Sequence, residues 1–139
     1  MTSDSEAQAA EVVSDPGCQQ MVGYQTEFDA AGTCRVTLDL AARHLNRHRI
    51  LHGGMVATLM DVACGHTAGR YFDPEGNASV VTVALSLSYI ASTSAGQVVA
   101  TARNTGGGKS TAHVMGELHD AEGQLLATAT AIFRRITPR

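Results

Sequence analysis

The sequence is short of basic charge and has no long apolar run. Its 10 Lys and Arg residues are outnumbered by 13 Asp and Glu, which gives a net charge of −3 and a pI near 6.0; general nucleic-acid binding usually requires a basic face. No apolar run reaches the roughly 18–20 residues that cross a bilayer. The N-terminal segment MTSDSEAQAAEVVSD carries acids but no basic or apolar block, so we predict no signal peptide. We therefore expect neither nucleic acid nor a membrane as a partner.

Cysteine is also scarce. Cys18, Cys34 and Cys64 are odd in number and form no C-x-x-C pair, which fits a reducing cytoplasm better than a disulfide framework. We interpret the three thiols as small packed or half-exposed side chains and expect a cytoplasmic location. A cysteine nucleophile stays open only at Cys64, one turn after Asp61.

What is present fits one globular domain. A length of 139 residues suffices for one core but not for two, and an apolar fraction of 44% is ordinary. Residues 1–17 are polar and Ala-rich, so we predict a flexible N-terminal tail or a short helix over 6–13. Residues 18–139 form the predicted domain.

Alternating apolar and polar residues predict strands over most of the domain. The predicted strands cover residues 21–30, 33–40, 79–90, 97–104, 111–119 and 125–136. The first two join through a turn at 31–32 as a hairpin, and residues 120–123 make a second hairpin turn. The last four strands are expected to form an antiparallel meander. Within 79–90, strict alternation puts Val81 and Val83 on one face and Thr82 on the other.

One long helix is predicted, from Gly54 to about Arg70, because apolar and small residues repeat there at helical spacing. Residues 71–76 end it with Pro and Gly. One helix and a strongly curved antiparallel sheet of five to six strands imply an α+β domain with a central helix wrapped by the sheet. Because the helix is apolar nearly all round, its far side must also be covered, by the sheet or by a second subunit.

A glycine-rich segment at 106–110 (GGGKS) invites comparison with a phosphate-binding Walker loop. That loop needs a glycine five residues before its final Gly-Lys-Ser, and Arg103 occupies this position with no helix pattern following. A nucleotide hydrolase is therefore rejected. The segment is either a flexible β-turn or a place where Lys109 and Arg103 meet a ligand phosphate at a sheet edge.

His44, His48 and His52 recur every four residues, a spacing that would form a ligand stripe on a helix. Here the adjacent glycines and arginines favour a loop, and no second set of ligands accompanies them. His113 and His119 lie on a separate predicted hairpin. No metal site is expected.

Asp61 is the one acid of the predicted helix, among Met, Val, Ala, Leu and Cys. A carboxylate in apolar surroundings costs free energy unless it is hydrogen-bonded or lies in a cleft, so Asp61 is either a structural acid or a functional one. Gly53 and Gly54 leave N–H groups unobstructed at the positive end of the helix. The acid and this helix start together suggest acyl chemistry.

The spacing of Gly53 and Asp61 constrains how they could act together. They are eight residues apart, about 12 Å along a helix, so one substrate carbonyl cannot touch both within one chain. We therefore hypothesise an isologous dimer whose antiparallel helices bring Asp61 of one subunit to Gly53 of the other.

The pattern of Asn46, then His52-Gly53-Gly54, then Asp61 nine residues after His52 resembles the PaaI-like branch of the hotdog-fold acyl-CoA thioesterases, in the 4-hydroxybenzoyl-CoA thioesterase superfamily. The predicted order of strands and helix fits that fold over roughly residues 18–136. The resemblance implies hydrolysis of an acyl-CoA thioester to a carboxylic acid and coenzyme A. It also implies a homo-oligomer, with a dimer as the minimum and a dimer of dimers expected, and no cofactor, because coenzyme A is part of the substrate.

By the same resemblance, Asp61 activates water or attacks the thioester carbonyl directly, and the Gly53 N–H stabilises the carbonyl oxygen. His52 and Asn46 match residues that orient the thioester and the water. Thr82 matches a hydroxyl on the following strand that assists the water. Contacts with coenzyme A or the acyl group are expected from Gly54, Met55, Leu59, Arg103, Gly108, Lys109 and Ser110.

Two other functions on the same fold stay as alternatives. A non-catalytic acyl-CoA-binding module would have no use for a carboxylate beside the thioester, so Asp61 counts against it. A hydratase or dehydratase needs a His–acid pair placed to remove an α-proton, whereas the His52–Asp61 spacing resembles the thioesterase pattern. The acyl group stays open between phenylacetyl-type, medium-chain, β-keto and hydroxylated groups.

Overall fold

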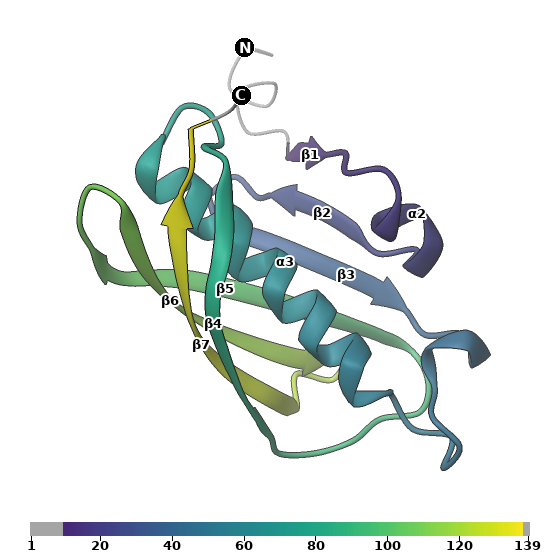
Figure 1. Cartoon of the computed structure of the whole chain (residues 1–139). Helices are drawn as coiled ribbons and strands as arrows, with labels where there is room; N and C mark the ends of the chain where they lie inside the picture. Colours follow the sequence, from purple (N-terminus) through teal and green to yellow (C-terminus); the bar gives the residue numbers. More distant parts are fainter. Residues whose placement is uncertain (1–9, 138–139) are drawn as a thin grey trace.

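A computed structural model describes residues 10–137 as a long helix lying in the concave face of one antiparallel sheet (Figure 1). The helix, α3 (Gly53–Phe72), follows a short helix, α2 (Cys18–Val22), and a 3-10 turn, η1 (Ala42–His44). The strands are β1 (Glu11–Val13), β2 (Gln25–Phe28), β3 (Cys34–Asp39), β4 (Val80–Tyr89), β5 (Gln97–Gly107), β6 (Thr111–Asp120) and β7 (Leu125–Arg135). This is the predicted α+β arrangement of a hotdog fold.

The sheet has seven strands, in the order β1-β2-β3-β5-β6-β7-β4, rather than the five to six expected. The additional strand is β1, in which Val12 pairs with Glu27 of β2. The predicted helix over 6–13 is therefore wrong for residues 11–13, while residues 6–9 lie outside the described part of the chain. The two valines of β1 favour an extended backbone once a neighbouring strand offers hydrogen bonds.

The predicted strand over 21–30 is correct only in its second half. Residues 18–22 form α2, which ends at Gly23 in the left-handed conformation (φ 92°), and β2 begins at Gln25. The Gly23 N–H donates to the carbonyl of Gln19 at 2.7 Å, a helix C-cap that glycine forms without steric cost. The chain therefore makes a helical turn before it enters the sheet.

The last four strands do not form the expected meander. Hairpins join β5, β6 and β7, but β4 pairs with β7 instead of β5, and β5 pairs with β3. Residues 90–96 therefore carry the chain from one edge of the sheet to its interior. This leaves β4 as an edge strand beside α3, where its side chains can reach the helix.

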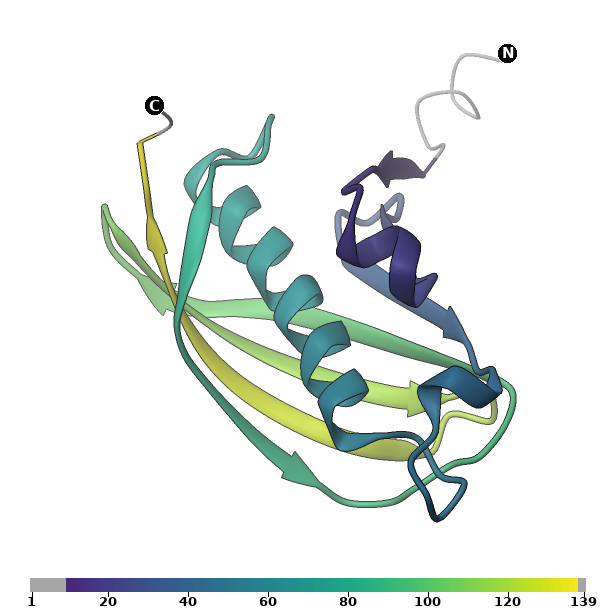
Figure 2. The ribbon, with the colours of Figure 1, turned by 45° about the vertical axis from the view of Figure 1, so that its right-hand side comes forward.

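The core lies between α3 and the concave face of the sheet. The sheet curves under the helix, with β4 along one side and β1 and α2 along the other (Figure 2). Gly116 of β6 permits close packing, because a Cβ there would lie 3.0 Å from the sulfur of Cys64. On the opposite face of α3, Asp61, Val62 and Gly65 are only partly buried. No helix within residues 10–137 is long and apolar enough to cross a membrane.

Candidate active site

The N-terminal end of α3 is held by polar contacts within its own loop. His52 is the N-cap residue, and its Nδ1 accepts a hydrogen bond from the Gly54 N–H at 2.8 Å. The carbonyl of Gly53 accepts from the Tyr89 hydroxyl, also at 2.8 Å. No described residue accepts from the Gly53 N–H. This first amide of the helix is therefore a free donor at the positive end of the helix dipole.

Asn46 shapes the loop that leads into this end of the helix. Its Oδ1 accepts from the N–H groups of His48 (2.9 Å) and Ile50 (3.4 Å), which closes a turn of the kind asparagine commonly makes. Asn46 and Gly53 line one cavity of about 410 Å³. We call Asn46, His52 and Gly53 the Gly53 half-site.

Asp61 lies about two turns further along α3, in a second cavity of about 550 Å³. Its Oδ1 accepts a hydrogen bond from the hydroxyl of Thr82 in β4 at 2.7 Å. That bond orients the carboxylate and leaves its second oxygen without a partner among the described residues. We call Asp61 and Thr82 the Asp61 half-site.

A β-bulge in β4 turns Thr82 toward the helix. Thr82 pairs with Phe133 of β7 and Ala84 pairs with Ile132, so the residue between them, Val83, has no partner of its own. Because of this extra residue, Thr82 faces the helix together with buried Phe133, while Ala84 and Ile132 line a cavity on the outer face of the sheet. The predicted strict alternation over 79–90 is therefore wrong at Val83.

The two half-sites are separate within one chain. Gly53 and Asp61 are eight residues apart, about 12 Å along α3, and they line different cavities. Neither cavity contains both residues. A single subunit therefore does not bring together the two groups that the sequence predicts to act on one carbonyl.

A family model describing the thioesterase superfamily matches residues 48–127. The matched segment contains α3 and the strands β4, β5 and β6, and with them His52, Asp61 and Thr82. The chain belongs to the thioesterase superfamily. The resemblance to this family that the sequence motifs indicated is thereby confirmed.

Several solved structures share the fold of this thioesterase-superfamily chain. The BH2602 protein from Bacillus halodurans, solved with CoA, is 26% identical, with a TM-score of 0.79 over 88% of this chain and 80% of that chain. The PaaI protein from the phenylacetic acid degradation operon of E. coli is 25% identical, with a TM-score of 0.73 over 86% of this chain and 84% of that one. The TT0310 protein from Thermus thermophilus is 27% identical, with a TM-score of 0.75 over 89% and 100% of the two chains. The comparison with curated proteins found no match.

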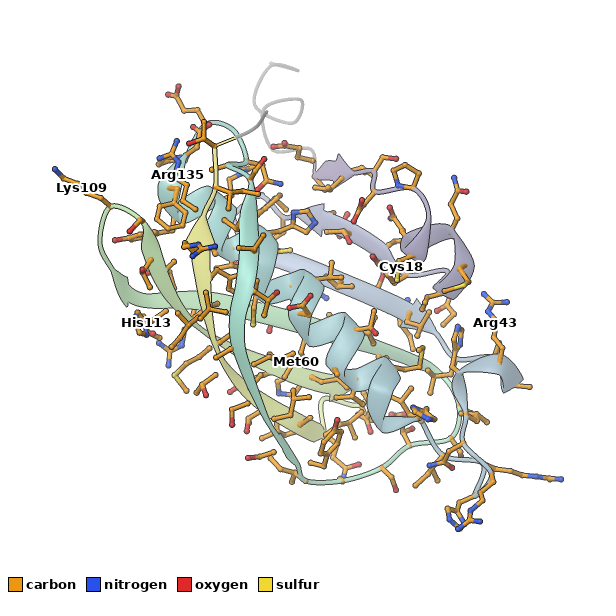
Figure 3. All side chains as sticks on the ribbon, in the orientation of Figure 1. Cys18, Arg43, Met60, Lys109, His113 and Arg135 are labelled. Carbon is orange, nitrogen blue, oxygen red and sulfur yellow. The ribbon has the colours of Figure 1, made fainter. Side chains whose placement is uncertain are left out.

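The predicted contacts with coenzyme A fall in two places. Gly108, Lys109 and Ser110 form the exposed tip of the β5–β6 hairpin, where Figure 3 shows the Lys109 side chain pointing away from the sheet. Arg103 lies in mid-strand, its Nη2 3.7 Å from the sulfur of Met115. Lys109 follows Arg103 by six residues, about 20 Å in an extended chain, so a single phosphate does not bridge them. The strands β5 and β6 on either side of the hairpin tip also lie inside the sheet rather than at its edge.

Two arginines that the sequence reasoning missed lie beside the hairpin tip. Arg134 of β7 pairs with Thr111, and the N–H of Arg135 donates to the Ser110 carbonyl at 2.8 Å. Figure 3 shows Lys109 and Arg135 at the same end of the molecule. Only the register of β6 against β7 brings these cations together, so no local sequence pattern indicated them.

The predicted acyl-pocket residues have packing roles in this structure. Leu59 is fully buried in the core, and Met55 packs against the core while partly exposed. Neither lines the cavity of a half-site. Gly54 is exposed, and its N–H is occupied by His52.

The thiol of Cys64 faces the sheet rather than the cavity around Asp61. It is fully buried, and burial raises its pKa to about 12, with the negative charge of Asp61 acting in the same direction. A protonated and enclosed thiol is a poor nucleophile. The possibility of a cysteine nucleophile at this position is therefore not supported by the geometry.

The histidines have distinct surroundings. His44 is buried; its Nδ1 accepts from the Ala41 N–H at 2.9 Å and its Nε2–H donates to the Val22 carbonyl at 2.6 Å. His66, which the sequence analysis did not single out, lines the Asp61 cavity. Within residues 10–137, no three His, Cys, Asp or Glu side chains form a cluster that could hold a metal ion.

Proposed function

We propose that this protein hydrolyses acyl-CoA thioesters, with Asp61 as the general base or nucleophile and the Gly53 N–H of a second subunit as the oxyanion donor. The observation that carries the proposal is the pairing of Asp61 with Thr82 in an open cavity. A carboxylate held by one hydroxyl, with its other oxygen free, can take a proton from water or attack a carbonyl. The unpaired Gly53 N–H supports the other half of the chemistry.

In the general-base form, Asp61 takes a proton from water while the water oxygen bonds to the thioester carbon. Negative charge develops on the carbonyl oxygen, where a fixed backbone N–H at a helix start lowers the barrier. The C–S bond then breaks, and coenzyme A leaves as a thiolate that takes up the proton held by Asp61. In the nucleophilic form, the Asp61 oxygen attacks the carbonyl carbon first and the C–S bond breaks, so that coenzyme A leaves as a thiolate. Water then cleaves the resulting anhydride, which restores Asp61 and supplies the proton that the thiolate takes up. Both forms release the carboxylic acid and coenzyme A, and neither requires a cofactor.

A homodimer is part of the proposal, because one chain separates the two half-sites. The edge strand β4 is ten residues long and exposes Val83 (59%) and Tyr89 (56%) to solvent. A long edge strand with exposed apolar residues is a template for pairing with another chain. If β4 pairs with its copy about a twofold axis, the two α3 helices lie antiparallel on one continuous sheet. The Asp61 half-site of each subunit then approaches the Gly53 half-site of the other.

Coenzyme A binding rests on different residues. Lys109, Arg134 and Arg135 belong to the same end of the sheet, and cations of this kind suit the phosphates of coenzyme A. The related Bacillus halodurans protein was solved with CoA. The hydratase alternative is weaker, because the Nδ1 atom of His52 is occupied as a helix cap.

The test replaces Asp61 by Asn, which keeps the shape and removes the base. We expect turnover of a good acyl-CoA substrate, followed by thiol release, to fall at least about 100-fold. Asp39→Asn is the matched control, because Asp39 is an exposed strand residue that accepts a hydrogen bond from Gln97, and it should leave turnover unchanged. Undiminished hydrolysis by the Asp61→Asn protein would refute the catalytic assignment.

A further inference from the structure

The loop that leads into α3 is closed at its base by a backbone hydrogen bond. The His52 N–H donates to the carbonyl of His44 at 2.9 Å, and inside this base Leu45 pairs with Leu51 as an isolated antiparallel bridge. Residues 44–52 therefore form a narrow hairpin whose two ends are His44 and His52. Since α3 begins one residue after His52, the placement of this hairpin decides where the first helical N–H lies.

The free N–H of Gly53 lies between two peptide groups that local contacts hold. On one side the carbonyl of His44 holds the N–H of His52. On the other side the Nδ1 of His52 holds the N–H of Gly54 at 2.8 Å. These contacts set the direction of the Gly53 N–H within the hairpin and the first helical turn. Where the hairpin lies against the rest of the domain depends on a different contact.

The buried ring of His44 makes that contact. Its Nδ1 accepts from the Ala41 N–H at 2.9 Å, within the turn around η1, and its Nε2–H donates to the carbonyl of Val22 at 2.6 Å. Val22 is the last residue of α2, and the final carbonyls of a helix have no partner inside it. The ring therefore ties the hairpin to a helix 22 residues earlier in the chain. Among the described residues, no other side chain of 44–52 hydrogen-bonds beyond residues 41–54.

Two further hydrogen bonds reach the same region, but neither replaces the ring. The Leu51 N–H donates to the carbonyl of Thr93 at 2.8 Å. A single bond of this kind leaves the hairpin able to pivot, and a second bond at His44 removes that freedom. The Arg43 Nη2 also donates to the Val22 carbonyl, at 3.1 Å, from an exposed side chain. A long surface side chain can keep this bond in many conformations, whereas the enclosed imidazole keeps it in one.

We infer that His44 is a positioning residue for the oxyanion donor. By binding the Val22 carbonyl through Nε2, the ring fixes the hairpin on α2 and holds the Gly53 N–H where charge develops on the thioester oxygen. The inference rests on the proposed hydrolysis at Asp61, and it gives α2, a short helix that the sequence did not predict, a part in the site. A misplacement of reacting groups by about 1 Å can cost about 100-fold in rate, so a loosened hairpin should lower kcat.

The test uses two replacements that each keep one of the two ring contacts. His44→Gln places an amide N–H near the position of Nε2 and keeps the bond to Val22. His44→Asn places an oxygen near the position of Nδ1 and keeps only the bond to Ala41. For a good acyl-CoA substrate we expect kcat to fall at least about tenfold in His44→Asn with KM within about threefold, and kcat to stay within about threefold in His44→Gln. The reverse order of effects would confine the role of the ring to η1 and overturns the inference.

Arg43→Ala is the matched control, because it removes the other donor to the same carbonyl and leaves the buried ring in place. Its kcat should stay within about threefold of wild type. Rates are taken per folded subunit and well below the unfolding temperature of each variant, so that lost stability does not count as lost turnover. A loss in Arg43→Ala equal to that in His44→Asn overturns the assignment to the ring.

A double-mutant cycle tests whether His44 acts through the Gly53 N–H. Gly53→Pro lacks this N–H, so adding His44→Asn should change its residual kcat by no more than about twofold. A further loss as large as in the wild-type background overturns the inference, because His44 would then act on the fold or on another group. Full activity of both His44 variants also overturns it and leaves the proposed hydrolysis standing. Undiminished turnover by Asp61→Asn overturns the proposed function instead.

Discussion

The two half-sites along the exposed face of α3 are built differently. At the Gly53 half-site the side chains serve the backbone: His52 caps the helix and Asn46 closes the preceding turn. What remains for a ligand there is the single backbone N–H of Gly53. At the Asp61 half-site the backbone is occupied by the helix, and the groups that face the cavity are side chains, Asp61 of α3 and Thr82 of β4.

This difference shows how the work is divided in the proposed dimer. A backbone donor can be fixed by a local motif, because its position depends only on the neighbouring loop and helix turn. A reactive carboxylate must be oriented by a group from another element, here Thr82 of β4. The Gly53 half-site is thus complete in local structure, whereas the Asp61 half-site depends on the register of the sheet.

The largest effect is expected at Gly53. Gly53→Pro removes the N–H. Proline is tolerated as the first helical residue, and the residue before it, His52, already has the extended backbone that a following proline requires (φ −63°, ψ 134°). Loss of one oxyanion donor should lower kcat about 100- to 1000-fold. Gly53→Ala keeps the N–H, and its Cβ would meet the Tyr89 ring at ordinary contact distances of 3.4–3.6 Å. If both variants lose activity equally, the N–H is not the operative group.

Mixing subunits tests whether the half-sites belong to different chains. Gly53→Pro and Asp61→Asn proteins, each inactive, are exchanged at equal amounts. Half of the dimers are then mixed, and each holds one intact site, so about a quarter of wild-type activity should return. Subunit exchange is followed independently by mass-tagged chains. Confirmed subunit exchange without recovered hydrolysis would refute the model in which each active site combines half-sites from two chains.

A smaller effect is expected at Thr82. Thr82→Val keeps the shape and removes the hydroxyl that donates to Asp61. A hydrogen bond to a charged group of this kind corresponds to about a tenfold loss of kcat/KM. Thr82→Ser retains the hydroxyl and should stay within about threefold of wild type. Equal rates for the Thr82→Val and wild-type proteins would show that the Asp61 carboxylate is not oriented by the Thr82 hydroxyl.

The same division explains what the sequence could predict. The half-site at Gly53 is encoded in nearly consecutive residues, so the helix that follows was predicted from its periodicity, and His52 and Gly53 were assigned roles through the resemblance that their motif carries. Asp61 was found because a lone acid is conspicuous on an apolar helix. The fold class followed from one helix and alternating strands, and membership of the thioesterase superfamily followed from the motif.

Features that depend on contacts between distant segments were missed. The place of β4 beside β7, and the bulge at Val83 that turns Thr82 inward, are set by strand pairing and not by local alternation. His66 was not singled out, because a histidine on a predicted helix carries no sign of its partner. Only the loop between α3 and β4, where Asn77 lies 2.9 Å from the His66 ring, reveals that it faces a cavity.

The smallest effect is expected at Cys64, directly beneath the Asp61 half-site. Burial raises the pKa of its thiol to about 12, so the folded protein holds this proton far above the pH at which an unfolded thiol would lose it. Cys64→Ala should therefore leave kcat within about twofold of wild type from pH 7 to 9. Because the truncation leaves a cavity that costs stability, rates are taken well below the unfolding temperature and per folded subunit. A loss of kcat as large as that of Asp61→Asn would show that the nucleophile is the thiol of Cys64 and not the carboxylate of Asp61. Unchanged rates in Cys64→Ala would leave the carboxylate of Asp61 as the single reactive group of its half-site, matched by the single backbone N–H of Gly53 at the start of the helix.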